Sequence, residues 1–157
     1  MTTKSKRPLI ESVEDLVPLL TLTGFRQFEI SGKRAEAIPI EKSESTDLKA
    51  LPEPQMDVQI MENHTDQHIE ARFRATVDNG VGVFLIDIGL LYNFSEPIDL
   101  GRVAINNFIE RIAIMAAWPF IREGIATTAA RMELPVPVLG LMKQGQATVQ
   151  LLESMQK

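Results

Sequence analysis

The chain has 157 residues, of which 45% are hydrophobic and 24% are charged; it has no cysteine and a formal net charge of −5. These values are typical of one globular domain with its own hydrophobic core, so we expect a single domain over residues 1–157. The missing cysteines exclude disulfides and thiolate metal sites, and no run of about 18 apolar residues is present to span a membrane as a helix.

The negative charge is concentrated in one window of the sequence. Between Glu41 and Asp66 there are seven acidic residues and two lysines, a difference of −5 that equals the net charge of the chain. Phosphate groups are bound by clustered Lys and Arg, so nucleic acid is not expected as a partner. Acidic residues also interrupt the N-terminal region where a signal peptide needs an apolar stretch, and this predicts a cytoplasmic protein.

The N-terminal region is predicted to contain a tail and a short helix. Residues 1–10 are expected to be disordered. Ser12 and Asp15 have nearly the spacing of a capping box, which predicts an amphipathic helix that runs to about Thr21. Pro18 lies late in this helix and is expected to kink or end it.

Strand patterns follow this helix. Gly24 is interpreted as the break after it, and Phe25–Ile38 is a predicted strand with a β-bulge at Gly32. The polar residues 41–54 predict a mobile acidic loop. Apolar and polar side chains then alternate with period two in Gln55–Glu62, which predicts a second strand.

The stretch His68–Phe94 carries the clearest local pattern. Its first half alternates strictly between apolar and polar residues, and the sequence Asp-Asn-Gly at 78–80 predicts a hairpin turn. The returning strand, Val81–Tyr92, is apolar on both faces and has Asp87 as its only charge. A strand of this kind in an antiparallel sheet indicates that both of its faces meet another surface, and Asp87 then needs either solvent or a basic partner.

A long helix is predicted for residues 100–132. Its middle, Ile112–Ile121, is apolar nearly all round and contains Pro119. The alternating prolines of Leu134–Leu141 require an extended segment, and Gln146–Gln156 is predicted as a short closing helix.

The sequence offers little catalytic or metal-binding chemistry. His64 and His68 have the i, i+4 spacing of zinc ligands on a helix, but they lie where a loop enters a strand, so we interpret them as surface residues. No nucleophile motif and no complete phosphate-binding loop is present. We therefore expect no metal, no cofactor and no enzymatic activity.

The helix and the two-sided strand offer more apolar area than one helix-on-sheet layer can bury. This surplus is explained by association between subunits or by a binding surface for apolar ligands. A well-packed monomer is the alternative.

Three segments together resemble the SecB export chaperones. They are VFLIDIGLLYNF (Val83–Phe94), WPFIREGI (Trp118–Ile125) and LPVPVLGL (Leu134–Leu141), and the resemblance covers residues 72–141. It implies an α+β fold in which a four-stranded antiparallel sheet packs against a long helix, with short helices near both termini. It also implies a homotetramer, built as a dimer of dimers through the long helices, that holds unfolded polypeptides in apolar grooves without ATP. Pro119 would then bend the helix to fit the sheet.

The resemblance assigns candidate roles to three groups of residues. The client-binding candidates are Phe25, Phe28, Tyr92, Phe94, Leu134, Val136, Val138 and Leu141. The candidates for a surface that meets a SecA-like motor are Leu85 and Asp87. The oligomer-interface candidates are Ile105, Ile109, Ile112, Met115 and Trp118.

Two departures from the export chaperones bear on the function. The chain begins with a basic tail instead of an acidic region, and it ends in ESMQK without an acidic tail. In both respects it is similar to divergent, solitary SecB-like proteins, some of which hold an unstable antitoxin. The hypothesis is a holdase for unfolded or pre-secretory clients, serving export through SecA or antitoxin control. The alternatives are an adaptor homo-oligomer whose apolar surface is used only in assembly, and a small-molecule carrier or enzyme.

Overall fold

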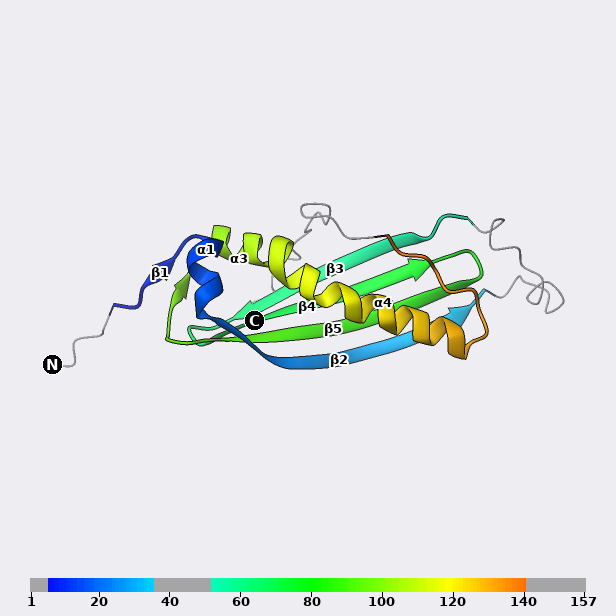
Figure 1. The fold of residues 1–157 in the computed structure, drawn as a ribbon, viewed down its shortest axis with the longest axis horizontal. Helices are drawn as coiled ribbons and strands as arrows, with labels where there is room; N and C mark the ends of the chain where they lie inside the picture. The colour runs from blue at the N-terminus through cyan, green and yellow to red at the C-terminus, as the bar shows by residue number, and fades with distance from the viewer. Residues whose placement is uncertain (1–5, 36–51, 141–157) are drawn as a thin grey trace, which may run out of the picture.

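The computed structural model describes residues 6–35 and 52–140. A long helical segment crosses one face of a four-stranded antiparallel sheet diagonally (Figure 1). The strands are β2 (Leu20–Arg34), β3 (Gln55–His64), β4 (His68–Asp78) and β5 (Gly82–Phe94), in the spatial order β2-β5-β4-β3. The predicted α+β architecture, with a four-stranded antiparallel sheet against a long helix, is confirmed.

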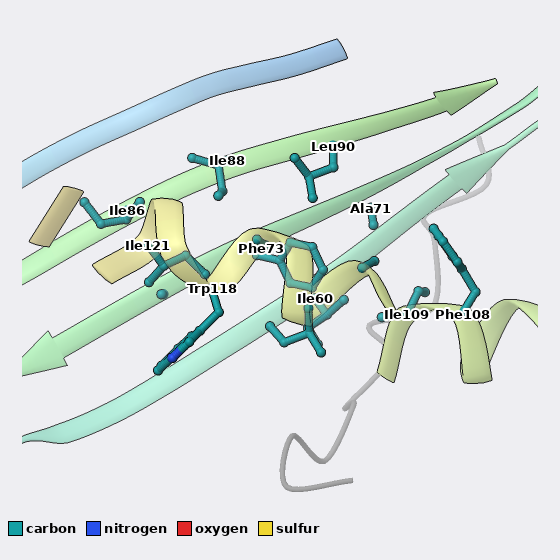
Figure 2. Packing of buried hydrophobic residues seen from close by; sticks show 14 of the residues in the cluster. Ile60, Ala71, Phe73, Ile86, Ile88, Leu90, Phe108, Ile109, Trp118 and Ile121 are labelled. Carbon is teal, nitrogen blue, oxygen red and sulfur yellow. The ribbon is translucent and has the colours of Figure 1, made fainter. Parts of the chain in front are cut away.

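The hairpin of β4 and β5 forms as its sequence predicts. Alternate residues of β4, from Ile69 to Val77, are fully buried on the helix side, because successive side chains of a strand point to opposite faces. Gly80 has φ of 84°, a conformation that glycine adopts without strain in the turn. Side chains of the sheet and the helix, among them Phe73, Ile86 and Ile121, lie in the layer between them (Figure 2).

The N-terminal region differs from its prediction. Residues 1–5 lie outside the described part of the chain, but Leu9–Ile10 form β1, which pairs in parallel with β6 (Asp99–Leu100). The expectation of disorder over residues 1–10 is therefore wrong for β1. Main-chain hydrogen bonds hold this pair at both ends, from the Asp99 N–H to the Pro8 carbonyl and from the Gly101 N–H to the Ile10 carbonyl.

The short N-terminal helix forms but ends early. Helix α1 (Val13–Leu16) begins after Ser12, whose hydroxyl oxygen accepts a hydrogen bond from the Asp15 N–H, as the capping pattern predicts. A 3-10 turn, η1 (Val17–Leu19), follows and contains Pro18, and β2 starts directly after it. The helix therefore does not extend to Thr21.

Two predictions for β2 were wrong. Gly24 lies within the strand instead of marking a break, and Gly32 is not a bulge, because it opposes Phe84 in regular register. The register shifts occur instead at Leu22/Gly24 and Gln27/Glu29. Gly32 has a different physical role: a Cβ at this position would lie 2.8 Å from Cγ2 of Thr128, near the end of the long helix.

The long helical segment has almost the predicted length but is not uniform. It consists of α3 (Arg102–Phe108), a π-helical segment η3 (Ile109–Ala113) and α4 (Ile114–Arg131), which contains Pro119. The π-helical segment was not predicted. Residues 134–140 follow without helix, as their prolines predict, whereas the expected helix Gln146–Gln156 lies outside the described residues. None of the described helices is long and apolar enough to cross a membrane.

Candidate binding surfaces

The two faces of the sheet have different surroundings. The long helix packs mainly against β5, on the face that carries Phe84, Ile86 and Ile88. On the opposite face no helix of the described chain lies over the sheet (Figure 1), and we call it the bare face. Alternate residues of β5, including Leu85 and Asp87, belong to the bare face because strand side chains alternate.

Large apolar side chains are exposed on the helix side of β2. Leu22, Phe25 and Ile30 oppose the helix-side residues of β5, yet each remains about half exposed, and we call these three the β2 patch. They are exposed because β2 is an edge strand and the helix lies chiefly over β5. The ring of Phe25 contacts that of Phe120 on α4, with 4.7 Å between the ring centroids.

A second apolar surface follows the outer side of the long helix. It consists of Ile112, Met115, Ala116, Pro119 and Phe120, all at least partly exposed, and we call it the helix stripe. Their spacing places them on one side of the helix, opposite the buried residues. The apolar character of Ile112–Ile121 thus has two causes, since one side packs on the sheet and the other forms an apolar outer surface.

The structure separates the client-binding candidates. Phe25 lies on the helix side, whereas Phe28, three residues later, lies on the bare face, because strand side chains alternate. Tyr92 is buried and packs edge-on against Phe108, and Phe94 is partly buried.

The C-terminal candidates also differ in exposure. Val136 and Val138 are exposed, and Leu141 lies outside the described residues. Leu134 is buried against Gly82, where a Cβ would lie 2.8 Å from Cδ1 of Leu134. In this single chain, Leu134 is therefore a core residue.

Burial of Tyr92 leads to a pH prediction. Desolvation raises the pKa of its phenol above the ordinary value of 10.0, because the charged phenolate is disfavoured in the core. A group whose pKa is raised on folding stabilises the fold fully below its unfolded pKa, and this contribution is lost as the pH rises through its folded pKa. We therefore expect the free energy of unfolding to fall above about pH 10. Tyr92 is the only tyrosine, so tyrosinate absorbance reports its titration directly, and an ordinary midpoint would contradict the prediction.

The oligomer-interface candidates also separate. Ile105, Ile109 and Trp118 are buried in the core of their own chain, whereas Ile112 and Met115 belong to the helix stripe. Sequence reasoning missed Phe120 as an exposed residue of this stripe. Its position one turn after Ala116 was a usable signal once the buried side of the helix was known.

Asp87 has its basic partners within the same chain. Its two carboxylate oxygens accept hydrogen bonds from Nε and Nη2 of Arg72, both at 2.8 Å, and Nη1 of Arg74 donates a third at 3.1 Å. The Asp87 side chain is only 1% exposed, so this carboxylate is not available on the surface. The hydrogen bond to Asp87 is the largest cause that raises the pKa of Arg72.

Phe28 covers this ion pair. The guanidinium carbon of Arg72 lies 3.8 Å from the centroid of the Phe28 ring, a cation–π arrangement. The ring has room because residue 89 is glycine: a Cβ there would lie 3.0 Å from Cε2 of Phe28. The glycine in β5 therefore allows Phe28 to cover the ion pair of Arg72 and Asp87.

The two histidines lie at the turn between β3 and β4. His64 opposes Ile69 on the helix side and its Nδ1 lies 2.9 Å from Oε2 of Glu62, while His68 opposes Asn93 on the bare face. Because they lie on opposite faces, the two rings do not converge. Among the described residues, no cluster of three or more His, Cys, Asp or Glu has the arrangement of a metal site.

Comparison with known proteins supports one family. The chain is 24% identical over 155 residues to the SecB-like chaperone SmegB of Mycolicibacterium smegmatis. This alignment covers 99% of this chain and 96% of SmegB. Its fold matches the SecB-like chaperone Rv1957 of Mycobacterium tuberculosis, solved in complex with a ChAD peptide from the antitoxin HigA1, with a TM-score of 0.65 at 12% identity. That match covers 83% of this chain and 92% of the other. The chain therefore has the SecB-like fold.

The resemblance to the SecB-like chaperones is thus confirmed, although no family model matches the chain. Both similar proteins are named as chaperones. This chain exposes apolar side chains on its helix side and an ion-paired cluster on its bare face.

Proposed function

We propose that this SecB-like chain is an ATP-independent holdase of the cytoplasm that binds unfolded polypeptides through its β2 patch. The observation that carries the proposal is the row of half-exposed large apolar residues along an edge strand, beside Phe120. An unfolded client offers scattered apolar side chains, and a flat apolar surface of this kind binds many such sequences weakly. Val136 and Val138 are further client contacts in this proposal.

We further propose that the helix stripe buries itself against other copies of the chain, giving a tetramer built as a dimer of dimers. Met115 and Phe120 are exposed on the long helix, and homo-oligomer interfaces are rich in such side chains. An adaptor oligomer without client binding would use the helix stripe alone. The two functions therefore differ in the role of the β2 patch.

Among possible clients we favour an antitoxin segment over a pre-secretory protein passed to SecA. A structure of similar fold holds an antitoxin peptide, which supports the first class. A role in export would need an accessible acidic surface near Leu85 and Asp87, and Asp87 is buried beneath two arginines.

The test is the aggregation of a chemically denatured protein diluted into buffer with this chain and without nucleotide. We expect the wild type to suppress light scattering and Phe25→Ser/Ile30→Ser to need about ten times more protein for the same effect, since two buried apolar contacts contribute more than 1.4 kcal/mol. The matched control is Phe28→Ser/Val83→Ser on the bare face, whose side chains are 45% and 38% exposed against 46% and 40% for the tested pair. No suppression by the wild type would argue for the adaptor, and equal loss in both variants would argue against the β2 patch as the client-binding surface.

A further inference from the structure

The centre of the bare face carries three arginines whose charges reach solvent. Arg26 of β2 and Arg72 of β4 both oppose Gly89 of β5, so they flank the ring of Phe28 that lies over this glycine. Arg74 lies one row further along, opposite Asp87. The cluster therefore spans three neighbouring strands.

The carboxylates of the same region are less accessible than these guanidinium groups. The arginine side chains are 59%, 33% and 38% exposed for Arg26, Arg72 and Arg74. The neighbouring Glu70 and Asp87 are 18% and 1% exposed, and only Glu29, at 46%, is open to solvent. The charges of these six groups cancel formally, but the surface that a partner meets is mainly cationic.

The guanidinium groups also keep hydrogen-bond donors to spare. Each arginine has several N–H donors in a fixed planar arrangement. Among the described residues, the three arginines donate three hydrogen bonds to carboxylates, all to Asp87. The ion pairs Arg26–Glu70 and Arg74–Glu29 are longer, at 3.7 and 3.5 Å.

We propose that the centre of the bare face is a docking surface for a carboxylate-rich segment of a partner protein, bound by the guanidinium groups of Arg26, Arg72 and Arg74. Arginine binds carboxylates with paired hydrogen bonds, and arginine and aromatic residues are enriched at protein interfaces. Phe28 supplies the apolar contact at the centre, and Asp87 holds Arg72 in a fixed orientation. This surface is distinct from the β2 patch and does not depend on holdase activity.

The proposal reverses the charge that the sequence suggested for a partner. Asp87 alone on an apolar strand predicted either contact with solvent or a basic partner, but its carboxylate is paired with Arg72 and Arg74 of the same chain. A basic segment approaching this face meets guanidinium groups first and is repelled by them. The surface therefore selects acidic over basic partners.

The test uses the full chain and a short fluorescent oligo-glutamate peptide ending in phenylalanine, with fluorescence anisotropy as the measurement. We expect the peptide to bind the wild type with an affinity that falls as the salt concentration rises. The affinity of Arg26→Glu should be at least about tenfold lower, because a pair between a guanidinium group and a peptide carboxylate is replaced by repulsion between two carboxylates. Arg26 is exposed and has no close hydrogen bond to Asp87, so this variant is expected to fold. Lys6→Glu makes the same charge change on the exposed N-terminal arm, outside the sheet, and should bind as the wild type does.

Four outcomes would overturn the proposal. The first three are equal binding of the acidic peptide by Arg26→Glu and the wild type, preferential binding of an oligo-lysine peptide, and tighter binding of a single-stranded oligonucleotide than of the acidic peptide. If the folded wild type binds none of these probes, the docking surface is also excluded. Aggregation assays on Arg26→Glu separate this result from the holdase proposal, because the variant leaves the β2 patch unchanged.

Discussion

Arg72→Leu is expected to lower the free energy of unfolding by about 3 kcal/mol, because it leaves a buried carboxylate without its bidentate partner. Asp87 is almost fully buried and Arg72 supplies two of its three hydrogen bonds. Arg74 would retain one hydrogen bond at 3.1 Å, which limits the loss. Chemical denaturation at one protein concentration, followed by the fluorescence of the single Trp118, measures the change.

Two further variants make this prediction specific. Arg26→Leu removes an exposed arginine of the same face, whose ion pair with Glu70 spans 3.7 Å, and it should change stability by less than about 0.5 kcal/mol. Arg72→Leu/Asp87→Leu removes both charges of the buried pair and should recover part of the lost stability. A loss in Arg72→Leu no larger than that in Arg26→Leu would show that the pair does not stabilise the fold.

Phe120→Glu is expected to shift the assembled protein to smaller species. The substitution places a carboxylate in the middle of the helix stripe, where burial against another subunit would leave the charge without a partner. An unpaired charge in an interface costs several kcal/mol, so the dissociation constant of the assembly should rise by at least about 100-fold. Sedimentation velocity across a concentration series measures this shift.

The matched control for this variant is Phe28→Glu. Both phenylalanines are 45% exposed, but Phe28 lies on the bare face and Phe120 on the helix stripe. We expect Phe28→Glu to assemble as the wild type does. A wild type that is monomeric at all concentrations, or equal dissociation of both variants, would exclude the helix stripe as the subunit interface.

Local patterns in the sequence were sufficient for several elements. The alternation in β4, the turn at 78–80 and the Ser12 cap all depend on residues close to each other in the chain, so their physical causes can be read locally. The length of the long helix was also predictable, because the sequence indicated where the helix begins and where it ends. The resemblance through Val83–Phe94 and Trp118–Ile125 identified the SecB-like fold.

Composition and short-range pattern thus determined the main strands and the long helix, the excess of apolar residues and the absence of disulfide and thiolate chemistry. Only the tertiary structure decided which side each candidate faces. The register shift at Gln27/Glu29 placed Phe25 and Ile30, five residues apart, on the same face, and pairing of β4 with β5 brought Arg72 and Arg74 onto Asp87. A bulge changes the alternation by one residue, and ion pairing across strands depends on register, so neither follows from the local pattern.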